Sequence, residues 1–158
     1  MTTLSEAVFF ARNLLAAESL IKAVPKKQVD LTAFVATEEK PVAESVVTIH
    51  TCGAVACLGG WVAVAPHFRA LGVVPNETSN APWIPSLGME DPDDVADFLF
   101  GNGEMFSPRG GSDYDQDIED SKSDRKAALH RLKARLKELL EEHDELKDYV
   151  KSVVTSVA

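Results

Sequence analysis

The C-terminal part of the chain carries a periodic apolar pattern that constrains its fold more than any other feature. Apolar side chains recur there at alternating steps of three and four residues, with one histidine in the series. The positions are Leu129, Leu132, Leu136, Leu139, His143, Leu146, Val150, Val153 and Val157. This is the a/d spacing of a heptad repeat. It predicts an amphipathic helix over 122–158 with a seam about 45 Å long at about 1.5 Å per residue.

Such a helix has two possible packing partners. We favour packing along an N-terminal helix and the core, because amphipathic helices are more common than dimerising coiled coils. In the alternative, part of the helix pairs with a second copy of the chain in a homodimer. The residues at that interface would be Leu132, Leu136, Leu139, His143, Leu146 and Val150. A protonated His143 at the seam would weaken this dimer.

The remaining segments favour further helices. Apolar residues at helical spacing predict a helix from Leu4 to Val24, which Pro25 ends. A second, short helix is expected after Asp91, which is a good capping residue, and before Gly101. Residues 75–87 are interpreted as a proline-punctuated loop, and residues 101–121 as an exposed loop.

A segment rich in small residues follows a β-branched run, Val46–Ile49, that suggests a short strand or an extended lead-in. Gly59 and Gly60 disfavour an isolated helix by about 1 kcal/mol each relative to alanine. We expect glycines to persist in a helix where another backbone passes close by. The segment from Cys52 to Pro66 is therefore predicted to contain a buried central helix that its neighbours approach closely.

Together these elements predict a mainly α protein with at most a minor β element. A chain of 158 residues suits one compact domain. We expect residues 1–121 to form a helical core with an acidic loop. Residues 122–158 form the long C-terminal amphipathic helix, and the whole is one domain.

Charge is distributed unevenly along the chain. Residues 76–124 hold thirteen acidic and two basic residues, whereas residues 1–75 are neutral and residues 125–158 carry a net charge of +2. The total of −9 argues against direct binding of nucleic acid, because such a chain repels phosphate. It favours a protein partner with a basic surface. The predicted contact residues, within the acidic segment Glu90–Asp120 and beside it, are Trp83, Asp113, Asp115, Asp117, Glu119 and Asp120.

Neither a leader nor a membrane span is expected. The first residues lack a basic region, and Glu6 and Arg12 interrupt the apolar stretch. The range Ser45–Pro66 has no Asp, Glu, Lys or Arg, but it contains polar residues and glycines that oppose insertion. Two shorter buried segments explain it better. We expect a cytoplasmic protein that contacts no membrane.

One cluster of residue types suits zinc, namely His50, Cys52, Cys57 and His67. The spacing fits a zinc site poorly, so we interpret the cysteines as small buried thiols and predict no cofactor. Zinc or a reactive thiol is the alternative. Asp113, Asp115, Asp117 and Asp124 also follow part of a calcium-loop pattern, but Ile118 stands where that loop needs glycine. A solvated acidic loop is expected instead.

The sequence contains no phosphate-binding glycine loop, nucleophile elbow or HExxH motif. We therefore expect a binding protein rather than an enzyme. An alternative function is sequestration of a small molecule or nucleotide in a pocket beside Gly59 and Gly60. A less favoured one is zinc- or thiol-dependent activity at Cys52 and Cys57.

Two stretches, HTCGAVACLGGW from His50 and LGMEDPDDVADFLFG from Leu87, carry a resemblance. They resemble small uncharacterised proteins of bacteriophages and prophages that have a Cys-Gly-Thr-x-x-Cys-x-x-Gly-like segment. Cys52, Gly53, Cys57 and Gly60 match this segment, while Ala54 replaces its usual threonine. Leu87, Gly88, Leu99 and Phe100 match a second pattern, a Leu-Gly-Leu turn followed by a short helix that ends in Leu-Phe. The resemblance implies a phage or bacterial origin and a mostly helical domain.

The resemblance transfers no catalytic residue. With the charge pattern, it suggests a non-catalytic phage-type accessory protein that engages a host factor, as a host-factor inhibitor would, or a phage protein. The expected location is the cytoplasm of the bacterial host.

Overall fold

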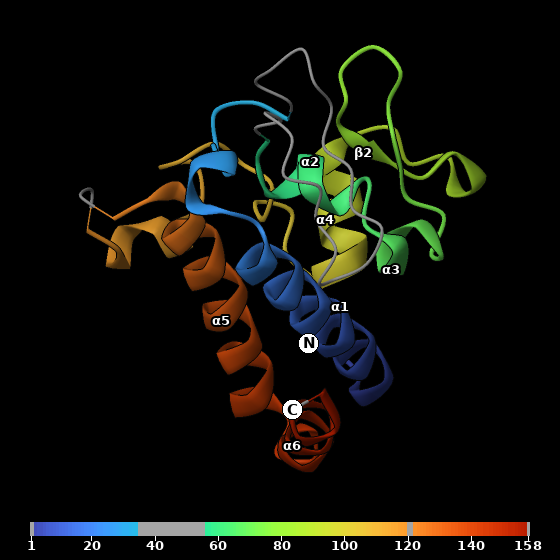
Figure 1. Cartoon of the computed structure of the whole chain (residues 1–158). Helices are drawn as coiled ribbons and strands as arrows, with labels where there is room; N and C mark the ends of the chain where they lie inside the picture. Colours follow the sequence, from blue (N-terminus) through green and yellow to red (C-terminus); the bar gives the residue numbers. More distant parts are fainter. Residues whose placement is uncertain (1, 35–55, 120–121, 158) are drawn as a thin grey trace.

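The protein is mainly α-helical with a minor β element (Figure 1). The computed structural model describes residues 2–34, 56–119 and 122–157. In that part of the chain the α-helices are α1 (Leu4–Ala23), α2 (Leu58–Val62), α3 (Pro66–Arg69), α4 (Pro92–Phe100), α5 (Asp124–Glu142) and α6 (Leu146–Val157). Three 3-10 helices are η1 (Lys26–Gln28), η2 (Pro85–Leu87) and η3 (Asp113–Asp117). The described helices confirm the predicted fold class.

The minor β element is a two-stranded antiparallel pair, β1 (Val74–Pro75) and β2 (Pro82–Trp83). Val74 lies opposite Trp83, and Pro75 lies opposite Pro82. The interpretation of 75–87 as an irregular loop was therefore incomplete, since the loop closes a short hairpin. The predicted strand at Val46–Ile49 lies outside the described residues.

The long helices α1 and α5 lie side by side, and α2, α3 and α4 gather beside the upper half of α1 (Figure 1). A single core runs between them and contains Leu14, Trp61, Phe100 and Leu132, each at most 1% exposed. Arg125 fastens the two long helices at one end. Its Nε donates to the carbonyl of Ile21 and its Nη2 to that of Lys22, at the C-terminus of α1.

The predicted limits of α1 and α4 are confirmed. Thr3 caps α1 through a capping box with Glu6, and the helix ends at Ala23, just before Pro25. Asp91 caps α4 by accepting a hydrogen bond from the backbone N–H of Asp93. Gly101 ends α4 in the left-handed conformation, at φ +70°, which glycine adopts without strain. These limits follow from local sequence alone.

The C-terminal segment differs from the prediction of one continuous helix. It forms two helices, and α6 lies across the lower end of α5 and α1 (Figure 1). The break falls at His143, the seam histidine, whose backbone is extended at φ −132° and ψ 98°. Its ring Nε2 lies 2.8 Å from the carbonyl oxygen of Thr2. A contact with the residues that precede α1 thus accompanies the break.

The predicted central helix is shorter than expected, because in the described residues it spans only Leu58–Val62. The reason for the glycines is nevertheless confirmed. The backbone of residues 28–33 runs beside residues 56 and 57, where Ala56 N–H donates to Gln28 O and Cys57 N–H donates to Ala33 O. A Cβ on Gly60 would overlap the carbonyl oxygen of Phe34 and lie 2.8 Å from Ala56 Cβ.

We expect Gly60→Ala to lower the free energy of unfolding by about 3 kcal/mol, because the new methyl group has to displace backbone rather than a flexible side chain. Urea denaturation followed by circular dichroism measures this loss. Gly103→Ala is the matched control. A Cβ there meets nothing closer than 3.4 Å, so its effect is expected to stay below about 1 kcal/mol. Equal losses for the two variants would contradict the close-approach interpretation.

Candidate interaction surface

The segment between α4 and α5 is held to the core by a buried arginine. Arg131 is fully buried, and the side chain of its partner Asp115 is 5% exposed. Nε and Nη2 of Arg131 donate to the two carboxylate oxygens of Asp115, at 2.8 and 2.6 Å. The other donors bind the carbonyls of Met105, Ser107 and Pro108. Every part of the buried guanidinium thus has an acceptor, as a buried charge requires.

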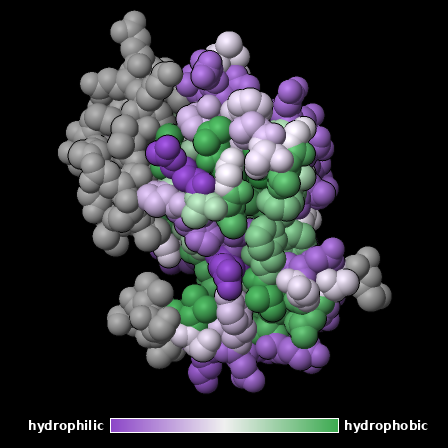
Figure 2. Space-filling model, turned by 90° about the vertical axis from the view of Figure 1, so that its right-hand side faces the viewer, coloured by the Kyte–Doolittle hydropathy of each residue, from purple (hydrophilic) through white to green (hydrophobic). Residues whose placement is uncertain are grey.

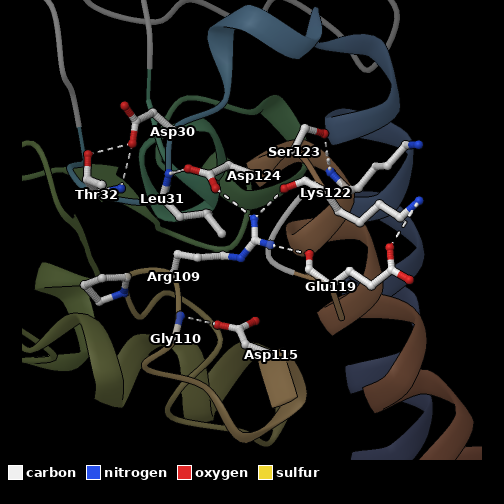
Figure 3. A network of polar contacts seen from close by, with 12 residues as sticks. Asp30, Leu31, Thr32, Arg109, Gly110, Asp115, Glu119, Lys122, Ser123 and Asp124 are labelled. Atoms are coloured by element: carbon white, nitrogen blue, oxygen red, sulfur yellow. Dashed lines mark hydrogen bonds and ion pairs between the residues drawn. The ribbon is translucent and has the colours of Figure 1, made fainter. Parts of the chain in front are cut away.

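A second arginine closes the other side of the segment. Figure 3 shows Arg109 between the carbonyl oxygens of Glu119 and Lys122, with its Nη1 3.0 Å from Asp124 Oδ1. The other carboxylate oxygen of Asp124 accepts from the backbone N–H of Leu31. These contacts join the segment to the start of α5 and to the chain after η1.

A tyrosine adds a third attachment of the segment to α5. The hydroxyl of Tyr114 donates to Glu138 Oε2 at 2.7 Å, and Glu138 also pairs with Arg135. Burial and the neighbouring Glu138 carboxylate raise the pKa of Tyr114, so the hydroxyl keeps its proton. Met105 and Phe106 are buried beneath the segment. The prediction that 101–121 is simply an exposed loop was therefore wrong for the described residues 101–119.

Acidic side chains of α4, of its cap and of the anchored segment remain exposed, and we call five of them the acidic surface. They are Asp91, Asp93, Asp94, Glu104 and Asp113. Glu104 Oε2 accepts a hydrogen bond from the backbone N–H of Asp113, which links the turn after α4 to the start of η3. In the described residues, no ion pair joins these five carboxylates to a lysine or an arginine.

The carboxylates of the acidic surface act on one another. Partial burial and then the negative charges of Asp91, Asp94 and Glu104 raise the pKa of Asp93. Like charges therefore share a small region without compensation. A cationic group placed there would relieve this repulsion, so the arrangement favours a basic partner.

Only some of the predicted contact residues are exposed and available to a partner. Asp113, Asp117 and Glu119 are exposed, although Glu119 lies 3.9 Å from the Lys122 ammonium. The prediction for Asp115 was wrong, because its buried carboxylate is paired with Arg131 and cannot contact a partner. Asp120 lies outside the described residues.

The prediction that Trp83 is an exposed contact residue was also wrong. Its side chain is only partly exposed, and the residue pairs with Val74 in the hairpin. Its indole Nε1 is buried and has no hydrogen-bond partner among the described residues. The acids of α4 and Glu104 lie within the predicted acidic segment but were not singled out. The capping pattern was the available signal for Asp91, Asp93 and Asp94, because it places them together at the cap and first turn of α4.

The zinc alternative gains no support from the described residues. His50 and Cys52 lie outside them, and no group of three or more His, Cys, Asp or Glu among the described side chains could hold a metal ion. Burial raises the pKa of the Cys57 thiol, so it stays protonated and unreactive. The remaining candidate, His67, is bound within the fold: its Nε2 donates to the side-chain oxygen of Asn13, whose amide nitrogen donates to Leu99 O.

The contacts of Asp115 overturn the calcium-loop alternative. Asp113 and Asp117 lie in η3, and both oxygens of Asp115 accept hydrogen bonds from Arg131, one of them also from the backbone N–H of Gly110.

The other alternative was a pocket beside Gly59 and Gly60 that holds a small molecule or nucleotide. Phe34 and the ring of Phe106 fill the space that side chains at Gly59 and Gly60 would need.

The predicted pairing residues of the seam are mostly buried within the chain. Leu132, Leu139 and Leu146 are at most 1% exposed, and Leu136 and Val150 are partly buried against the core. His143 is bound to Thr2. These residues therefore form no exposed seam for a second copy, which corrects the coiled-coil alternative. Among the described residues, no helix has the length and apolarity needed to span a membrane.

Comparison with known protein families, with curated protein sequences and with solved structures yields no match for this chain. The interpretation of the acidic surface therefore depends on the geometry of this chain alone.

Replacing Asp115 should be far more costly than replacing its exposed neighbours. Asp115→Asn leaves the Arg131 charge buried without its counter-ion, so we expect a loss of about 3 kcal/mol or more in the free energy of unfolding. Asp113→Asn and Asp117→Asn, at exposed positions, should each stay within about 0.5 kcal/mol of the wild type. Urea denaturation at pH 7 compares the three variants. A small effect at Asp115 would contradict its role as the anchor.

The same pair predicts a dependence on pH. Burial alone would raise the pKa of Asp115, but the hydrogen bonds from Arg131 and Gly110 and the arginine charge outweigh it and lower the pKa. The carboxylate therefore contributes its full stability above about pH 5. This contribution falls as the pH drops through the unfolded value of about 3.9 toward the lower folded pKa. Unfolding free energies between pH 7 and pH 3 should decrease less steeply for Asp115→Asn than for the wild type.

Proposed function

We propose that this protein is a non-catalytic accessory protein that binds a basic-surfaced protein partner through its acidic surface. The observation that carries this proposal is the acidic surface, whose carboxylates have no lysine or arginine partner among the described residues. It lies on α4 and on the segment after it, which Arg131 and Arg109 hold in place. Charges on a fixed framework keep their spacing, so a partner meets a preorganised surface.

The contrast between anchored and free carboxylates supports a role in binding. Asp115 and Asp124 are engaged by arginines, and their removal would loosen the segment. Among the described residues, the five members of the acidic surface have no arginine or lysine partner. Burial and then the negative charges of its neighbours raise the pKa of Asp93. A basic partner offsets this repulsion, speeds encounter by electrostatic steering and sets the register of the complex.

The biological setting is proposed from the sequence resemblance. It is a phage or prophage protein in the cytoplasm of a bacterial host, with a host factor or a phage protein as the partner. A partner that normally binds nucleic acid offers the required basic surface. The acidic chain would then compete with nucleic acid for that surface.

Neutralising the acidic surface should abolish capture of the partner. The test variant is Asp94→Asn, Glu104→Gln and Asp113→Asn, which removes three charges and preserves the Asp91 cap. The control is Glu77→Gln, Glu145→Gln and Asp148→Asn, which removes three exposed charges elsewhere. Each protein is immobilised and exposed to bacterial lysate in low and high salt, and the bound proteins are identified by mass spectrometry.

We expect the wild type and the control to capture the same basic protein in low salt, and the test variant to lose it. With that protein purified, the dissociation constant of the test variant should rise at least about tenfold. Equal affinity of the two triple variants would refute the acidic surface as the binding site.

A further inference from the structure

The junction between α5 and α6 lacks any residue that ordinarily breaks a helix. It consists of His143, Asp144 and Glu145, with no glycine or proline. The heptad spacing also passes through it without a shift, since Leu139, His143 and Leu146 keep the steps of four and three. Local sequence thus favours a straight helix at the point where the structure bends.

The bend leaves helical hydrogen bonds unmade. The N–H of His143 still bonds to Leu139 O, but among the described residues the N–H groups of Asp144 and Glu145 donate to no backbone carbonyl. A straight helix would provide both with acceptors four residues earlier. The bend is therefore maintained by contacts elsewhere in the fold.

Those contacts are made with the start of α1. His143 Nε2 lies 2.8 Å from Thr2 O, and Glu142 Oε1 accepts from Thr2 N–H at 2.9 Å. Farther along, Leu146 is fully buried and the Tyr149 hydroxyl accepts a hydrogen bond from Arg12 Nε at 3.5 Å. Helix α6 thus docks chiefly on the N-terminal half of α1.

This docking leaves apolar surface in contact with water. Leu4 at the start of α1 is 43% exposed, and Val154 on α6 is 55% exposed. Apolar side chains gather on the face shown in Figure 2, including its lower part, at the height that α6 has in Figure 1.

We propose that α6 is exchanged between two copies of this chain, which gives a domain-swapped dimer. In the exchanged form α5 and α6 join into one straight helix through residues 143–145. Each α6 then lies on the α1 of the second copy. The occupant of the α1 site stays chemically identical, so the contacts of Leu146 and Tyr149 are re-formed between chains. The junction gains its missing helical hydrogen bonds, and a short hinge of this kind favours exchange.

Two substitutions at one position test the hinge in opposite directions. Asp144→Pro should hold the closed monomer, because proline lacks the N–H that a straight helix uses and clashes with the preceding turn. The extended backbone of His143 already suits a residue before proline. Asp144→Ala removes the contact of Asp144 with Lys147 at 2.7 Å and raises helix propensity, so it should favour exchange.

Light scattering after size exclusion, over a range of concentrations, measures the dimer dissociation constant of each full-length protein. We expect a concentration-dependent dimer for the wild type, a dissociation constant at least about tenfold lower for Asp144→Ala, and a monomer for Asp144→Pro. Thermal unfolding confirms that each variant folds. The same dissociation constant for all three proteins, or a monomer throughout, would overturn the proposal.

Cross-linking identifies which helices meet in the dimer. The Asp144→Ala chain, with Cys52→Ser and Cys57→Ala, is prepared with either Arg12→Cys or Tyr149→Cys. The two proteins are mixed, allowed to exchange and treated with a short bismaleimide. A 12-to-149 link between different chains is the expected result. Predominant 149-to-149 links would instead show a coiled coil of straight helices and refute exchange.

Discussion

The buried charge of Arg131 is the constraint on which the acidic half of the molecule depends. A guanidinium removed from water has to have every donor satisfied, and here Asp115 and three backbone carbonyls supply the acceptors. Those carbonyls belong to residues 105–108, so one side chain of α5 fixes the path of the segment that follows α4. The glycine- and aspartate-rich composition of that segment would otherwise favour a loose loop.

This anchoring divides the carboxylates into two groups with different roles. Asp115 and Asp124 neutralise arginines and stabilise the fold. The acidic surface lies beside them, and partial burial, followed by the negative charges of Asp91, Asp94 and Glu104, raises the pKa of Asp93. The net charge alone could not distinguish these groups. Only the position of the arginines shows which acids are available to a partner, and the acids of α4 are more available than Asp115.

The features that sequence predicted are those set by neighbours in the chain. Pro25 after α1, the cap at Asp91 and the glycine at 101 predicted where α1 and α4 begin or end, and the structure adds a capping box at Thr3. The anchor was missed because Arg131 and Asp115 are sixteen residues apart and nothing in either local pattern pairs them. The role of Gly60 was predicted as a close approach, but the approaching residue, Phe34, could not be named from spacing.

The bend at His143 differs from these cases, because there local sequence and tertiary structure favour different conformations. The heptad pattern favours a straight helix, whereas the contacts with Thr2 and with α1 hold α6 at an angle to α5. A helix interior without glycine or proline bends only if docking of α6 on α1 stabilises the chain by more than the missing helical hydrogen bonds cost. Since α1 of a second copy offers the same docking site, exchange satisfies both preferences together. The conflict between pattern and structure is thus itself information about a second arrangement of the chain.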